Sequence, residues 1–215
     1  MDAFYDKWKG QIIPVFNHSD YDVCEHVLEA CYNGGIRVFE FTNRGENAYD
    51  IFVRLQQYNP YSDLSLGVGS VVYKQDAVRF IDAGARFIVG PCLSLPVLEV
   101  CQERKIPYIP GCGTITEIFN AQQLGCELTK LFPGDVYGPA MVKDLMAPMP
   151  WSKVMVTGGV KPEKDNLDTW FQAGAWCVGM GSQLFTKQLL ESHDYETLTR
   201  SLQQLTCNLL TGRSW

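Results

Sequence analysis

Short apolar runs alternate with amphipathic segments along nearly the whole chain, and this alternation limits the fold more than any other feature. The pattern predicts strands at 12–16, 37–42, 64–70, 87–89, 108–109, 127–132, 153–157 and 176–178, and helices at 23–32, 48–57, 76–82, 96–104, 115–124, 138–146, 166–172 and 195–210. The strands start roughly 20 to 28 residues apart, close to the length of one strand–helix unit. Eight such units predict an α/β fold, a single-domain (β/α)8 barrel.

A doubly wound open sheet is the alternative arrangement of the same units. The first strand–helix turn, residues 17–20, reads Asn-His-Ser-Asp and lacks the glycine-rich fingerprint of a dinucleotide-binding sheet. The barrel is therefore favoured. We expect one domain over residues 1–215, with an N-terminal segment at 1–10 and a helical C-terminal segment at 186–215.

Charge and composition restrict the partners and the location. The 215 residues carry a formal net charge of -6, which argues against nucleic acid or an anionic membrane surface as a partner. The start of the chain has no basic segment followed by an apolar one, and no apolar run approaches membrane-spanning length. We therefore expect a soluble, cytoplasmic protein in which any anion is bound locally.

The spacing of the cysteines and histidines does not match that of metal ligands. The eight cysteines include no CxxC pair, and the three histidines are scattered. Their apolar neighbours suggest reduced thiols that serve as small buried side chains. We expect neither a metal nor an organic cofactor.

Lys130 lies near the end of an apolar strand, in the run at 128–132 that Pro133 follows, where an ammonium group is costly to desolvate. Strand alternation places Glu40 on the face opposite Phe39 and Phe41, which should pack under the outer helices. Both polar side chains then point into the barrel, as a nucleophilic amine and an acid/base carboxylate. The alternatives are a lysine that extends to solvent and a glutamate that pairs with a nearby arginine, Arg37 or Arg44.

Two glycine-rich turns follow the last two predicted strands. They are the segments 156–160, Val-Thr-Gly-Gly-Val, and 178–182, Val-Gly-Met-Gly-Ser. In barrels, the loops after the seventh and eighth strands often bind phosphate through exposed backbone N–H groups. Either turn alone is as well explained by local structure, but the two together predict a phosphorylated ligand.

Several short motifs follow one another along the chain: Gly35–Arg44, Gly67–Val71, Pro110–Thr114, Thr129–Gly134, Thr157–Gly159 and Gly179–Ser182. In this order they resemble the class I aldolases that cleave 2-keto-3-deoxy-6-phosphogluconate (KDPG) or 4-hydroxy-2-oxoglutarate (KHG). The resemblance runs from Ile12 to Phe185.

The resemblance implies a barrel that assembles as a homotrimer and cleaves KDPG to pyruvate and glyceraldehyde 3-phosphate without a cofactor. Lys130 would form the Schiff base, and Glu40 would be the general acid and base. The resemblance further implies two sets of binding residues. The pyruvyl part would contact Arg44, Thr42, Ser70, Pro91, Phe132 and Thr157, and the phosphate would contact Gly158, Gly159, Gly179, Gly181 and Ser182.

The chain departs from the family pattern at three places. Asn17 and His18 stand where many relatives have a basic residue, Ser70 replaces a common threonine, and Gly90 precedes Pro91 where serine or threonine is common. These positions bear on the substrate, because specificity depends on pocket contacts. KHG and the galactonate epimer of KDPG stay open as substrates. So do a phosphosugar isomerase, a thiamine-phosphate-type synthase and a non-catalytic barrel that binds a sugar phosphate.

Overall fold

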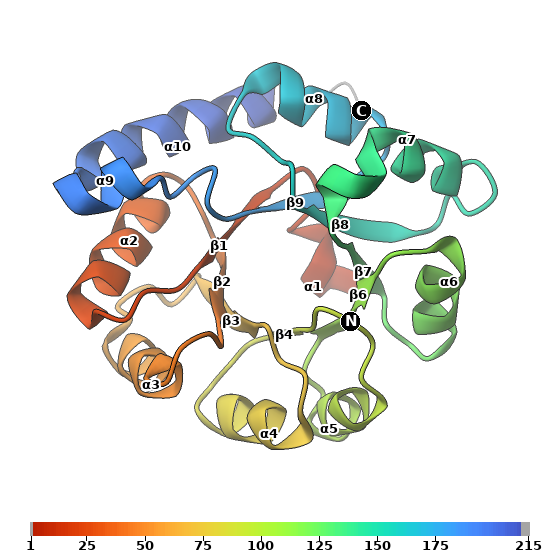
Figure 1. The fold of residues 1–215 in the computed structure, drawn as a ribbon, viewed down its shortest axis with the longest axis horizontal. Helices are drawn as coiled ribbons and strands as arrows, with labels where there is room; N and C mark the ends of the chain where they lie inside the picture. The colour runs from red at the N-terminus through yellow and green to blue at the C-terminus, as the bar shows by residue number, and fades with distance from the viewer. Residues whose placement is uncertain (1, 212–215) are drawn as a thin grey trace.

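The computed structural model describes residues 2–211 and has parallel strands inside a ring of helices (Figure 1). The strands are β1 (Ile12–Phe16), β2 (Val38–Thr42), β3 (Ser65–Gly69), β4 (Ile88–Val89), β5 (Tyr108–Ile109), β6 (Gly111–Cys112), β7 (Leu128–Leu131), β8 (Lys153–Thr157) and β9 (Cys177–Met180). The helices are α1 (Asp2–Asp6), α2 (Tyr21–Asn33), α3 (Ala48–Tyr58), α4 (Lys74–Asp82), α5 (Leu95–Arg104), α6 (Ile115–Gln123), α7 (Gly134–Met146), α8 (Lys164–Gln172), α9 (Lys187–Ser192) and α10 (Tyr195–Thr211).

The sheet closes through a strand that Pro110 divides in two. Its order is β5-β4-β3-β2-β1-β9-β8-β7-β6, so β5 and β6 end the list on opposite sides although one residue separates them in the chain. Proline has no N–H to donate, which interrupts the regular ladder at this point. Its carbonyl still accepts from the Lys130 N–H at 2.9 Å. The predicted fifth strand at 108–109 corresponds to β5, and β6 extends it by two residues beyond Pro110 that were not predicted. The predicted (β/α)8 barrel is confirmed.

Alternate residues of the strands face two separate cores, as strand parity requires. Phe39 and Phe41 pack outward with the helices, and Phe41 lies 6.3 Å from the Phe52 ring of α3. The inward residue Val38 belongs to a second apolar cluster inside the barrel. This inner cluster consists of Tyr5, Trp8, Ile13, Val38, Phe87, Val89, Ile109, Leu128, Met155 and Cys177.

The N-terminal segment closes the barrel at the amino ends of the strands. Trp8 is buried and meets the Phe87 ring edge-on at 4.8 Å. The indole N–H of Trp176 donates to the Tyr5 carbonyl at 2.8 Å. This bond connects α1 to β9, which begins at the next residue, Cys177. In Figure 1, α1 accordingly lies within the ring of strands. The catalytic end of such a barrel is the opposite one.

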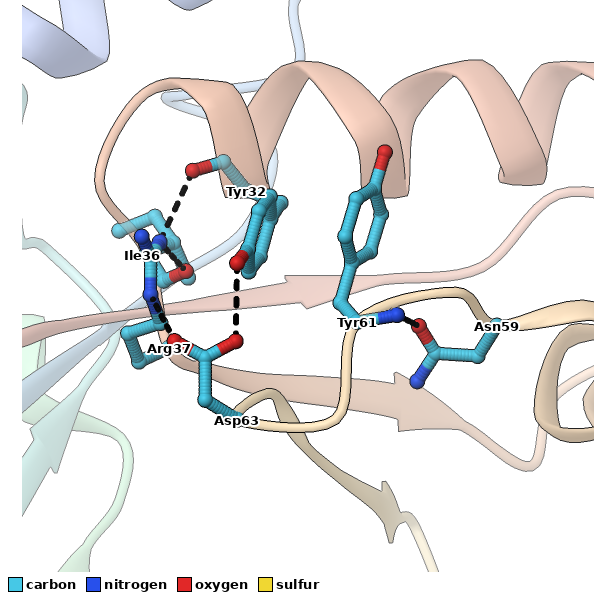
Figure 2. Close-up of polar contacts among 6 residues, drawn as sticks. All are labelled: Tyr32, Ile36, Arg37, Asn59, Tyr61 and Asp63. Carbon is cyan, nitrogen blue, oxygen red and sulfur yellow. Dashed lines mark hydrogen bonds and ion pairs between the residues drawn. The ribbon is translucent and has the colours of Figure 1, made fainter.

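A polar cluster joins the loops before β2 and β3, and it removes one alternative for Glu40 (Figure 2). The Arg37 guanidinium binds Asp63 at 2.8 Å and lies over the Tyr32 ring at 4.0 Å. Tyr32 also stacks on Tyr61 and donates its hydroxyl to Asp63. Arg37 is therefore engaged at the amino end of β2 and forms no ion pair with Glu40.

Some boundaries and local features differ from expectation. Helix α7 begins at Gly134 and is broken at Gly138, whose φ of 69° is not helical. Most of the cysteines are buried as predicted, but Cys92 and Cys207 are exposed, because Cys92 lies in the loop after β4 and Cys207 on an outer face of α10. Residues 212–215 of the predicted C-terminal segment lie outside the described part. Among the described residues, no helix is long and apolar enough to span a membrane.

Candidate active site

A cavity of about 570 Å³ opens at the carboxyl ends of β1, β2, β8 and β9. It is lined by Val15, Phe16, Asn17, Thr42, Arg44, Phe132, Asp135, Thr157, Gly158, Gly159, Val160, Gly179, Gly181, Ser182, Gln183, Phe185 and Leu190. The lining combines apolar walls with a few polar groups and two glycine-rich turns. This composition is typical of a site for a small polar ligand.

Lys130 and Glu40 face one another on the inner wall of the barrel. Their side chains are 8% and 1% exposed, and Lys130 Nζ lies 3.7 Å from Glu40 Oε1. The ammonium group also lies 5.4 Å from the centre of the Phe132 ring. Gly69 provides the space for the carboxylate, because a Cβ at that position would lie 1.8 Å from Glu40 Oε1. Strand parity thus predicted the inward direction of both side chains correctly.

The Glu40 carboxyl group is electrostatically unusual. Burial raises its pKa from the ordinary value, and the neighbouring Lys130 and Arg44 charges lower it only in part. Neither carboxylate oxygen has a hydrogen-bond partner among the described residues. A buried carboxyl group with a raised pKa keeps its proton to a higher pH than an exposed one does, which suits general acid–base chemistry.

Arg44 is held at the mouth of the cavity by three polar neighbours. Its Nε donates to Ser70 Oγ at 2.9 Å, and its carbonyl accepts from the Asn17 amide at 3.2 Å. The Thr42 hydroxyl donates to the same Asn17 side chain at 2.8 Å. Ser70 has a φ of 60°, a left-handed conformation that is uncommon for serine. These contacts fix a guanidinium group that can bind a carboxylate in two places at once.

The two glycine-rich turns and Thr157 form the other side of the cavity. Thr157 Oγ is buried and has no hydrogen-bond partner among the described residues. Gly179 is required beside it, since a Cβ there would lie 2.3 Å from that hydroxyl. Gly158 and Gly159 both have positive φ values, 100° and 71°, which side chains would strain. The turns can therefore bring bare backbone N–H groups close to an anion.

The cavity gathers most of the predicted site residues but not all of them. Lys130 and Glu40 are buried and are not among the residues that line the cavity, and Ser70 reaches the site through Arg44. Pro91 does not line the cavity; it lies against β6, where a Cβ on Gly111 would come 2.1 Å from the Pro91 carbonyl oxygen. The functional roles of these residues stay predictions.

Three polar residues that line the cavity were not predicted as binding residues: Asn17, named only as a departure from the family pattern, and Asp135 and Gln183, which sequence reasoning missed. Asn17 directly follows β1, so its place at a strand end was an available signal. Asp135 and Gln183 follow the Pro133-Gly134 and Gly181-Ser182 turns, where only the glycines drew attention. Among the described residues, no group of three or more His, Cys, Asp or Glu side chains could hold a metal ion.

Comparisons with known proteins point to one family of aldolases. The family model "KDPG and KHG aldolase" matches residues 6–201. The KHG/KDPG aldolase of Escherichia coli K12 is 31% identical over 193 residues, covering 89% of this chain and 88% of the relative. The 2-dehydro-3-deoxy-phosphogluconate aldolase of Dickeya dadantii is 32% identical over 192 residues, covering 88% of each.

A solved structure agrees in fold over nearly the whole chain. The KDPG aldolase of Legionella pneumophila, captured with pyruvate as a covalent carbinolamine intermediate, superposes with a TM-score of 0.85. It is 26% identical, and the match covers 95% of this chain and 98% of the other. The chain therefore belongs to the KDPG and KHG aldolase family and is an aldolase, a lyase.

Proposed function

We propose that this protein is a Schiff-base aldolase that cleaves KDPG reversibly to pyruvate and glyceraldehyde 3-phosphate. The observation that carries the proposal is the Lys130 amine, which is buried 3.7 Å from a buried carboxylate beside a cavity of about 570 Å³. A buried lysine amine next to a carboxylate on the inner wall of a barrel is suited to imine formation, because the amine is the nucleophile and the carboxylate can exchange protons with it. The Legionella relative, which holds pyruvate as a carbinolamine, supports the same chemistry.

The first half of the reaction joins the substrate to the enzyme. Neutral Lys130 attacks the C2 ketone of the 2-oxo acid and gives a carbinolamine. Glu40, through a water molecule, delivers the proton that lets hydroxide leave as water, and an iminium ion remains. Arg44 and Thr157 hold the substrate carboxylate, which fixes C2 against the amine.

The second half breaks the carbon–carbon bond. Glu40 takes the proton of the C4 hydroxyl, the C3–C4 electron pair moves into the iminium system, and the aldehyde departs. The remaining enamine of pyruvate takes a proton at C3, and water then hydrolyses the imine to free Lys130 and release pyruvate. A carboxyl group whose pKa is raised by burial can perform both the uptake and the return of the proton.

The phosphate end of the substrate decides between the candidate 2-oxo acids. The turns with Gly158, Gly159, Gly179, Gly181 and Ser182 lie on one side of the cavity and favour a phosphorylated substrate. KHG, which carries a carboxylate there, and the galactonate epimer of KDPG are the runners-up. Initial rates of pyruvate release show which of the three acids is the preferred substrate. A large preference for KHG would contradict the proposal that the glycine turns bind a phosphate.

Borohydride trapping tests the mechanism. Reduction in the presence of pyruvate should add the mass of a reduced pyruvyl group to the peptide that contains Lys130. An unmodified peptide under conditions of full turnover would refute the Schiff base. Glu40→Gln should slow turnover by about a hundredfold or more while trapping at Lys130 persists. Sugar-phosphate binding without any turnover would instead indicate a non-catalytic barrel.

We also propose a homotrimer that works in the cytoplasm. Large exposed apolar side chains in, or just before, the first two turns of helices α4 to α7 support self-association. They are Val72, Tyr73, Leu95, Ile115, Phe119 and Val136. Light scattering after size-exclusion chromatography should give three times the chain mass of 24.2 kDa, and a monomer at micromolar concentration would contradict the trimer.

A further inference from the structure

Asp135 lies against the turn that the proposed function assigns to the phosphate. It lines the cavity from the first turn of α7. A Cβ built on Gly158 would lie 2.9 Å from Asp135 Oδ1, and one on Gly159 would lie 2.8 Å from the Asp135 Cβ. An anion bound by that turn would therefore sit within a few ångströms of a carboxylate.

No structural task in the described part of the chain accounts for this carboxylate. It is exposed, and among the described residues it forms no hydrogen bond or ion pair. An acidic residue in a first helical turn commonly complements the helix dipole. Here the left-handed Gly138, with φ 69° and ψ 172°, separates the turn of Asp135 from the rest of α7. The peptide dipoles of the part of α7 after Gly138 therefore do not add to a positive helix end at Asp135.

The charges that line the cavity are divided between its two ends. Among the described lining residues, Arg44 is the cationic side chain and Asp135 is the carboxylate. Arg44 follows β2 next to Glu40, whereas Asp135 lies beside the turn after β8. The pyruvyl end of a substrate thus meets a positive charge, and its far end meets backbone N–H groups together with a negative charge.

We propose that Asp135 is a specificity-determining residue that weakens the binding of an anionic terminal group at the glycine turns. The inference rests on the proposed function, which places the phosphate there. The turns attract the anion and Asp135 opposes it, so the phosphorylated aldehyde is bound less tightly and leaves faster. Substrates that end in a neutral hydroxyl are not repelled by the Asp135 carboxylate.

The experiment compares Asp135→Asn with Asp144→Asn, a variant with the same charge change at an exposed position on the same helix that does not line the cavity. Binding of inorganic phosphate is measured by calorimetry, and kcat/KM is measured for KDPG and for the same acid without its phosphate. Asp135→Asn should tighten phosphate binding about tenfold and raise kcat/KM for KDPG by a similar factor, mostly through KM. The gain should shrink with added salt, because ions screen exposed charges. The unphosphorylated acid should change less than about twofold, as should every parameter of Asp144→Asn.

Three results would overturn the inference. They are unchanged or weaker phosphate binding in Asp135→Asn, an equal gain for both substrates, and the same gain in Asp144→Asn. Asp135→Glu keeps the charge and should bind phosphate as the wild type does, which separates charge from local folding. The calorimetric result stands apart from the Schiff base. A wild-type protein that gives no borohydride adduct therefore refutes the proposed function, while a shift in phosphate affinity still supports the role of Asp135.

Discussion

Replacing Lys130 with methionine should expose the electrostatic coupling between the two buried groups. Methionine keeps an unbranched side chain of similar length but removes the charge. At 3.7 Å, and with an effective dielectric constant of about 20, the attraction between ammonium and carboxylate is worth about 4 kcal/mol. Burial already raises the pKa of Glu40, and Lys130 is the strongest of the neighbours that oppose this rise. Its loss should raise the pKa of Glu40 further.

The direction of the effect on stability follows from proton linkage. An acid whose folded-state pKa is raised contributes stability that is fully present below its unfolded value, near 4.5, and is lost as pH rises through the folded value. In the wild type this loss begins above about pH 4.5 and ends at the raised pKa. In Lys130→Met the free energy of unfolding should continue to fall up to a higher pH, by up to about 1.4 kcal/mol per pH unit.

The assay is urea unfolding between about pH 4 and pH 9 for the wild type, Lys130→Met and the double variant Lys130→Met/Glu40→Gln. The double variant has no carboxyl group at this site and should lose the extra slope. Turnover should be absent in both variants, whereas inorganic phosphate should bind to Lys130→Met as it does to the wild type. If Lys130→Met and the double variant unfold with the same pH dependence, Glu40 is not coupled to Lys130 and the reasoning fails.

Three further substitutions test the surrounding structure. Asn17→Ala removes two hydrogen bonds from the loop that carries Arg44 and should raise KM about tenfold with kcat changed less than about threefold, measured by steady-state kinetics. Trp8→Ala should lower the free energy of unfolding by about 3–5 kcal/mol in urea titrations, since the indole is buried under the barrel. Gly69→Ala places a methyl group where the Glu40 carboxylate lies and should reduce kcat by about a hundredfold.

Each substitution has a control or an outcome that contradicts it. A fall in kcat for Asn17→Ala at unchanged KM would argue against a role in positioning Arg44. Trp151→Ala, at a residue that is 66% exposed, should change stability by no more than about 0.5 kcal/mol, and an equal loss in both tryptophan variants would contradict the account of Trp8. Full activity in Gly69→Ala would mean that the carboxylate position is not needed for turnover.

The sequence predicted those features that depend on local periodicity. The alternation of apolar runs predicted the strand–helix units, and the two-residue period of strands predicted that Glu40 and Lys130 point inward while Phe39 and Phe41 point outward. The break of the fifth strand at Pro110 and the break of α7 at Gly138 were not predicted. Both depend on how neighbouring strands and turns use the local backbone hydrogen bonds.

Sequence by itself therefore determined the barrel, the pair of buried charges and the two glycine turns, because each follows from residue spacing or from a short motif. Only the tertiary structure decided which residues meet across the barrel mouth. Asn17 binds the loop of Arg44 across 27 positions of the chain, and Asp135 lies beside Gly158 from a different unit. No local pattern encodes such contacts, because barrel closure sets the distances between residues that are far apart in the chain.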